Sequence, residues 1–170
     1  DIFYPHCVFP DKDAMKELSV FTASQLCLDH NKIKHYLDVI LLFEPNQHYS
    51  TVNINSHGFR GSEISLIKPD DTYRIFMVGG STTFGTASTS DQTTIPGYLE
   101  KKINESEINF NVEVINAGIG GADSARELYY INNVLQKFNP DMYIIYDGYN
   151  DAVRELEFGE FGVNERVDVF

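Results

Sequence analysis

The segment that most constrains the fold is residues 72–85, TYRIFMVGGSTTFG. Residues 75–78 form an unbroken apolar run, which is typical of a parallel strand buried on both faces. Gly79 and Gly80 follow directly, and glycines allow a tight turn in which nothing bulky shields the next side chain. We therefore expect Ser81 at the carboxyl end of a strand and the start of a helix, where open α/β sheets hold their ligands.

Two more segments, residues 112–116 (VEVIN) and the apolar run 142–146, are expected to form strands. Helical spacing predicts helices over 94–103 and 125–138, the second opened by a capping box of Ser124 and Glu127. This order of elements predicts parallel strands joined by right-handed crossovers, in a three-layer α/β/α sandwich. All three strand ends then meet at one edge of the sheet.

The remaining segments flank this core. We expect residues 1–68 to form an N-terminal helical extension and lead-in, and residues 69–170 to form the α/β core. Residues 13–41 keep helical spacing in one or two pieces, and 52–54 suggest a short strand. Residues 152–170 have poor periodicity and are expected to form a loop or lid.

Arg60 lies in a turn framed by Gly58 and Gly61, where it can clamp a carboxylate. The carboxylate belongs either to Glu63 or to a ligand, and we favour a structural ion pair.

Composition excludes several classes of protein. The chain has 170 residues, 42% of them hydrophobic, which suits one globular domain with its own core. A net charge of −12 argues against a nucleic-acid partner and against adsorption to anionic membranes. No apolar run approaches the roughly 18 residues of a membrane span. The chain begins with Asp1 rather than Met, so we expect a processed or excised chain, and an anchor outside it is compatible with the sequence.

The two cysteines, Cys7 and Cys27, do not form a CxxC motif, and no histidines cluster with them, so we expect no zinc site. Two interpretations stay open. The cysteines pair in an oxidising compartment, or they are two unpaired core residues.

The three strand ends carry chemically useful groups. Ser81 can supply a nucleophilic oxygen. The backbone N–H groups of Ser81 and Gly121, together with the Asn150 side-chain amide, can point at one developing oxyanion. A serine after a strand is often only a helix cap, and glycine or Asn-Asp after a strand is often only a turn. The conjunction of all three is therefore what points to a site.

Three short motifs carry a family resemblance: GGST at 79–82, NAGIGG at 116–121 and GYND at 148–151. Together they resemble the blocks of the SGNH hydrolase superfamily, the GDSL-like lipases and esterases. The resemblance implies a flavodoxin-like sheet. It implies Ser81 as nucleophile, Gly121 and Asn150 as oxyanion donors, and four substrate-binding positions: Gly80, Gly118, Gly120 and Asp151. Gly80 stands where many members carry Asp.

The resemblance implies hydrolysis of a small ester or an acylated glycan through an acyl-serine, with no metal or cofactor. Residues 55–61, NSHGFRG, are similar to a lead-in of extracytoplasmic, often membrane-anchored members. They imply an extracytoplasmic or secreted location. The family's late Asp-x-x-His base has no counterpart, because no histidine follows His57. We favour a fragment that ends before that block. An inactive relative that only binds, or His57 acting as the base, are the alternatives.

Two readings from other classes also remain. Gly118 and Gly120 lie between a strand and a helix, as in a dinucleotide-binding loop, but Asp123 stands where the third glycine is needed. The P-loop pattern of nucleotide-binding proteins is absent as well. The second of these is an interaction domain that binds an acylated glycan or protein without turnover.

Overall fold

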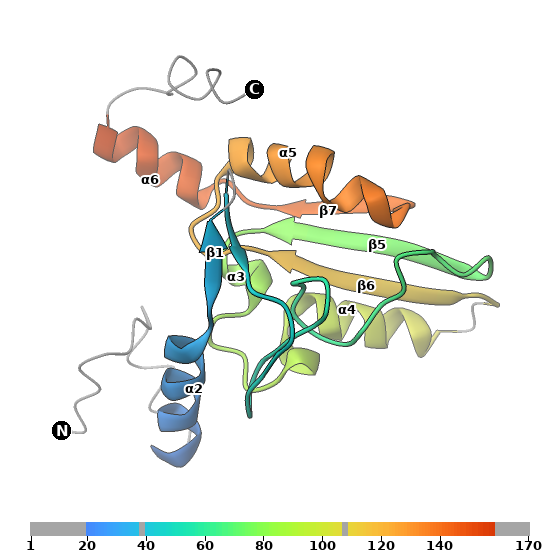
Figure 1. Ribbon diagram of the computed structural model, residues 1–170, viewed down its shortest axis with the longest axis horizontal. Helices are drawn as coiled ribbons and strands as arrows, with labels where there is room; N and C mark the ends of the chain where they lie inside the picture. The colour runs from blue at the N-terminus through green and yellow to red at the C-terminus, as the bar shows by residue number, and fades with distance from the viewer. Residues whose placement is uncertain (1–19, 38–39, 107–108, 159–170) are drawn as a thin grey trace.

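The computed structural model has a mixed α/β fold built on a three-stranded parallel sheet (Figure 1). It describes residues 20–37, 40–106 and 109–158. The strand order is β6–β5–β7, with β5 (Thr72–Gly79) between β6 (Asn111–Gly118) and β7 (Met142–Tyr146). Both neighbours run parallel to β5. The three strands expected from the sequence are therefore confirmed, and their carboxyl ends meet at one edge.

Alternate residues of β5 point to opposite faces of the sheet, and helical residues pack against each face. Phe76 and Val78 belong to a cluster that includes residues of α5 (Ser124–Asn133) and of the 3₁₀ turn η2 (Leu135–Phe138). Ile75 and Met77 belong to a second cluster, against which α4 (Ile95–Asn104) packs. Figure 1 shows α4 and α5 on opposite sides of the sheet.

The predictions for the two crossover helices agree with the structure to different degrees. The helix expected over 94–103 is α4, and Thr94 caps it by accepting the Gly97 N–H. The helix expected over 125–138 is α5 followed by η2, because the α-helix ends at Asn133. On α5 Leu128 is exposed, whereas Tyr130 is buried.

The expected loop after β7 is wrong in its first part, because α6 (Tyr149–Phe158) is a helix. A salt bridge from Arg154 Nε to Asp123 Oδ2, at 3.0 Å, ties α6 to the start of α5. The apolar residues Tyr149, Val153 and Leu156 of α6 keep helical spacing, which the prediction of a loop overlooked. Residues 159–170 of the expected lid lie outside the described residues.

The N-terminal part is less helical than expected. Helix α2 (Val20–Lys32) is followed by a hairpin of β1 (His35–Leu37) and β2 (Leu41–Phe43), so the prediction of helix to residue 41 is wrong. The Gln47 side chain accepts the Lys34 N–H at 2.7 Å and donates to the Lys34 carbonyl at 2.9 Å. These bonds hold the chain in an extended conformation after α2. Residues 13–19 lie outside the described range.

A second hairpin joins β3 (Gln47–His48) to β4 (Asn53–Ile54), near the short strand expected over 52–54. Isolated bridges then link Ile54 to Arg60 and Arg60 to Asn116 of β6. The N-terminal residues and the sheet share one core, since Ile54 and Phe59 pack in the same cluster as Phe76.

Arg60 is buried and forms an ion pair, as favoured from the sequence, but its partner is Asp91. The Nε–Oδ1 distance is 2.8 Å. The guanidinium also donates to the carbonyls of Thr51 at 2.8 Å, Phe84 at 3.1 Å and Gly85 at 2.7 Å. Arg60 thus fastens the lead-in to the residues that follow Ser81.

Glu63, the partner considered from sequence proximity, instead accepts hydrogen bonds from the backbone N–H and the hydroxyl of Ser56. The sequence suggested that Arg60 binds the carboxylate of either Glu63 or a ligand. Because the guanidinium is occupied by Asp91 and three carbonyls, Arg60 is a structural residue.

Two questions left open by composition have partial answers. Cys27 is buried on α2 and disulfide-bonded, and Cys7 lies outside the described residues. Within the ranges given above, no helix is both long and apolar enough to cross a membrane.

Candidate functional site

Ser81 is exposed and begins the single-turn helix α3 (Ser81–Phe84), directly after β5. The two glycines before it lie in close contact with other residues. A Cβ placed on Gly79 would lie 2.2 Å from the Thr83 hydroxyl oxygen. One placed on Gly80 would lie 2.7 Å from the Asn150 amide nitrogen. At position 79 a Cβ would also lie 2.4 Å from the Tyr146 carbonyl oxygen, so the backbone excludes a side chain there, whereas at position 80 only the Asn150 side chain would have to move.

Asn150, in the first turn of α6, joins two of the three strand-end loops. Its amide nitrogen donates to the Ala122 carbonyl at 2.5 Å, in the loop after β6. The same nitrogen lies beside Gly80, the residue before Ser81. The structure therefore brings the Ser81 turn, the loop that holds Gly121, and Asn150 together, as the parallel topology predicts.

The three glycines of the β6 loop play different structural parts. Gly121 has φ +73°, in the left-handed region that favours glycine. Gly118 packs against α3, because a Cβ there would lie 2.2 Å from the backbone nitrogen of Phe84. Gly120 faces open space, with no atom within 4 Å of a Cβ position. Among these three, Gly118 is therefore the one that sets the position of α3.

Two possible oxyanion donors are unoccupied within the described ranges. The backbone N–H groups of Ser81 and Gly121 donate to no acceptor among those residues. Both residues are exposed. The Ser81 hydroxyl likewise makes no hydrogen bond with any described residue. These groups are thus available to a bound molecule.

Asp151 holds the start of α5. Its carboxylate accepts the Ser124 N–H at 3.0 Å and the Ser124 hydroxyl at 2.5 Å. Asp123 is the N-cap of α5 and accepts the Arg126 N–H at 3.0 Å. The capping box predicted for Ser124 and Glu127 is therefore wrong, because Ser124 is already the first helical residue.

Glu127 is the residue near the site that sequence reasoning misread. Its side chain is buried on α5, next to the loop after β7. Burial, with Asp147 and Asp151 nearby, raises the pKa of the Glu127 carboxyl to about 8. Burial also raises the pKa of Asp147, and Asp151 adds to this shift. A glutamate three residues after a serine is also the pattern of an exposed capping box, so the sequence contains no cue that Glu127 is buried.

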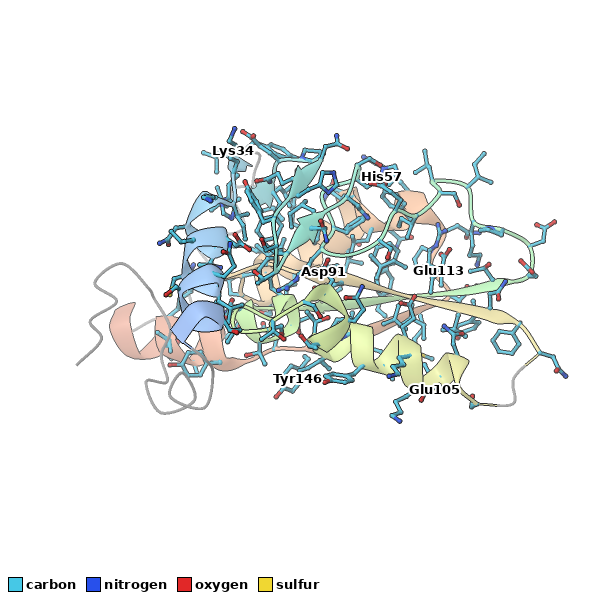
Figure 2. All side chains as sticks on the ribbon, turned by 90° about the horizontal axis from the view of Figure 1, so that it is seen from below. Lys34, His57, Asp91, Glu105, Glu113 and Tyr146 are labelled. Carbon is cyan, nitrogen blue, oxygen red and sulfur yellow. The ribbon has the colours of Figure 1, made fainter. Side chains whose placement is uncertain are left out.

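His57 lies away from Ser81. Its ring contacts Phe138 edge-on at 5.0 Å, and its Nε2 lies 3.1 Å from the Ile64 carbonyl. Phe138 precedes β7, so His57 lies toward the amino ends of the strands. Figure 2 shows it well apart from Tyr146, the last residue of β7. This position does not support His57 as the base for Ser81.

Another described histidine, His30, lies near the turn that follows Ser81. It is half-buried and lines a small cavity with Phe84 and Thr86. Burial lowers its pKa, and the neighbouring His35 and Arg60 lower it further. Within the described ranges no group of acidic, histidine or cysteine residues is arranged to hold a metal ion.

A larger cavity of about 310 Å³ lies elsewhere, between α4, the outer edge of β6 and the Arg60 turn. None of the predicted site residues lines it. On this edge the Asn104 side chain bonds both backbone groups of Val112, and Glu100 accepts the Val114 N–H. Helix α4 thereby covers the outer backbone of β6.

No protein-family model matches the chain, and no curated protein matches it at a significant level.

Proposed function

We propose that this protein is a serine ester hydrolase of the SGNH type. Ser81 is the nucleophile, and the Gly121 N–H and the Asn150 amide hold the oxyanion. The observation that carries the proposal is the Asn150 amide nitrogen, which lies against Gly80 while bonded to the Gly121 loop. A flavodoxin-like three-layer sandwich is part of the proposal, and the placement of α4 and α5 supports it.

In the proposed reaction, the Ser81 oxygen attacks the ester carbonyl carbon and the carbonyl oxygen becomes an oxyanion. Backbone N–H donors fixed before the reaction stabilise this charge at no cost of reorganisation. The oxyanion then collapses, and the proton lost by the Ser81 hydroxyl passes through solvent to the departing alcohol. Water then attacks the acyl-serine, which releases the carboxylic acid and returns a proton to the Ser81 oxygen. Asn150 has two amide hydrogens, so it can donate to the oxyanion while keeping its bond to Ala122. Gly118, Gly120, Gly80 and Asp151 shape this edge rather than take part in the chemistry.

The substrate in this proposal is a small ester or an acylated glycan, and the location is extracytoplasmic. The disulfide-bonded Cys27 supports that location, because disulfides persist in oxidising compartments.

A second candidate is an acyl-binding domain without turnover. One observation favours it: the Ser81 hydroxyl has no hydrogen-bonded base among the described residues. A serine hydroxyl is a poor nucleophile at neutral pH without such a base.

The two candidates are separated by covalent labelling of the protein purified from its native source. We expect a fluorophosphonate probe to label Ser81 and the protein to hydrolyse p-nitrophenyl acetate. Ser81→Ala should abolish the labelling and reduce turnover to the uncatalysed background. Ser62→Ala, on an exposed loop, is the matched control and should keep both. Turnover that persists in Ser81→Ala refutes the hydrolase proposal. An unlabelled wild type that still binds acyl esters supports the second candidate.

A further inference from the structure

Four carboxyl groups gather where the start of α5 meets the start of α6. We call them the carboxylate cluster: Asp123, Glu127, Asp147 and Asp151. Glu127 is only 3% exposed, although it carries an ionisable group. With every carboxylate ionised, both Glu127 oxygens and Asp147 Oδ2 are buried without a hydrogen-bond donor. Buried polar atoms without partners are rare, so this arrangement requires a physical explanation.

The two arginines beside the carboxylate cluster pair with Asp123. Arg154 Nε of α6 lies 3.0 Å from Asp123 Oδ2, and Arg126 Nη1 of α5 lies 3.9 Å from the same oxygen. Asp151 receives its hydrogen bonds from Ser124. Asp123 and Asp151 are therefore compensated.

The elements packed around the cluster contribute two further buried titratable groups. They are Tyr143 of β7 and Glu155 of α6, each with a buried oxygen that lacks a partner among the described residues. Neither group adds a cation. The Glu127 side chain contacts that of Asp147, which also contacts Asp151 and accepts the Gly148 N–H. In the part of the chain that the structure describes, no cation forms a salt bridge with Glu127 or Asp147.

We propose that Glu127 and Asp147 share one proton at neutral pH, and that this proton holds the α5 N-terminus against the loop that begins α6. A protonated carboxyl has an O–H donor, which supplies the hydrogen bond that two ionised carboxylates cannot form. Two carboxylates in one buried site do not both ionise readily, because their charges repel and neither is well solvated. When the proton leaves at alkaline pH, the repulsion acts directly across the joint between the two helices.

This contact between the start of α5 and the loop that begins α6 matters for the candidate site, because it lies between the Gly121 loop and Asn150. Asp147 is three residues before Asn150, and Glu127 is on the helix that follows Gly121. Loss of the proton is therefore expected to loosen the contact between Asn150 and Ala122. A loss of esterase activity at alkaline pH would follow. That consequence rests on the proposed function, whereas the proton and its effect on stability do not.

The sign of the pH effect follows from proton binding. The pKa of Glu127 is 4.5 in the unfolded reference and about 8 in the folded protein, raised chiefly by burial. Between these values the folded protein binds more protons than the unfolded chain. Stability therefore falls as the pH rises through this interval. An ordinary surface glutamate with an unshifted pKa produces no such fall.

The test has two arms. In the wild type, carboxyl ¹³C resonances of Glu127 and Asp147 are followed from about pH 3 to about pH 10. We expect coupled titrations, with one proton lost above neutral pH. In the second arm, thermal unfolding is measured over the same range. The wild type should lose several degrees of melting temperature from about pH 6 to about pH 9, and Glu127→Gln should lose distinctly less. A glutamine side chain keeps the shape of a protonated glutamate and has a hydrogen-bond donor, but it does not titrate in this pH range.

Three comparisons complete the design. Asp147→Asn should flatten the pH dependence as Glu127→Gln does, and the double variant should add little, because one proton is shared. Glu105→Gln, on the exposed surface of the chain, is the matched control and should follow the wild type. Ordinary titration of both carboxyls near pH 4 overturns the proposal. So does an equal loss of melting temperature in the wild type and Glu127→Gln. Both readouts are independent of esterase activity.

Discussion

Arg60→Met is expected to lower the free energy of unfolding by about 3–5 kcal/mol, because it leaves a buried carboxylate without its cation. The side chains of Arg60 and Asp91 are 2% and 9% exposed. Three carbonyls, those of Thr51, Phe84 and Gly85, would also lose a donor. Asp91 keeps its hydrogen bonds from Asn53, which places the loss within this range rather than above it. Urea unfolding followed by circular dichroism measures the change.

A double-mutant cycle with Asp91→Asn isolates the charge pair from the rest of the network. We expect Arg60→Met combined with Asp91→Asn to be more stable than Arg60→Met alone, because the unpaired charge is then gone. Lys102→Met is the matched control. It removes a cation from an exposed pair with Glu105, and such pairs contribute about 1 kcal/mol or less. A loss for Arg60→Met no larger than that of the control would show that the ion pair does not stabilise the fold.

The local signals in the sequence predicted the sheet and the meeting of its three loops. A parallel strand buried on both faces has a continuous apolar sequence, as residues 75–78 of β5 do. Residues 142–146 are a second apolar run, although β7 is at the edge of the three-stranded sheet and its residues are half-buried or exposed. Once three strands are parallel, the chain has no freedom to place their ends apart. The neighbourhood of Gly80 and Asn150 is thus a consequence of topology that a reader of the sequence can reach.

Long-range partners were not predictable in the same way. Arg60 pairs with Asp91, which is 31 positions away, although Glu63 is three positions away. The choice depends on how the lead-in folds back onto α3, which no local pattern encodes. Glu127 shows the same limit, because its spacing from Ser124 fits a cap equally well. Its burial next to Asp147 and Asp151 depends on the tertiary fold.

The two misassigned segments have different causes. Residues 35–43 have apolar spacing that fits a helix, but Gln47 bonds the backbone of Lys34 and favours a hairpin. There a polar contact from another element overrides the pattern of hydrophobicity, which records only average burial. In α6 the helical pattern is present, because Tyr149, Val153 and Leu156 keep helical spacing among acidic residues. The prediction of a loop overlooked that spacing.

Gly118→Ala is expected to destabilise the protein by about 1–3 kcal/mol or more and to displace the helix that bears Ser81. The added Cβ would lie 2.2 Å from the backbone nitrogen of Phe84 and 2.7 Å from its Cα. Backbone atoms cannot rotate out of the way as a side chain does, so α3 or β6 must shift as a unit. Ser81 begins α3, and its turn is already fitted closely against Asn150. Labelling of Ser81 should therefore fall more than the loss of stability alone explains.

Gly120→Ala, two residues along the same loop, provides the matched control. No atom lies within 4 Å of its Cβ position, and its backbone is outside the left-handed region, so an alanine meets neither a clash nor strain. We expect its urea midpoint to stay within about 0.5 kcal/mol of the wild type and its labelling to be unchanged. The two glycines are indistinguishable in the motif, and the contact with Phe84 is what separates them. If both alanine variants behave alike, the packing of Gly118 against α3 does not position Ser81, and the loop glycines act through the backbone alone.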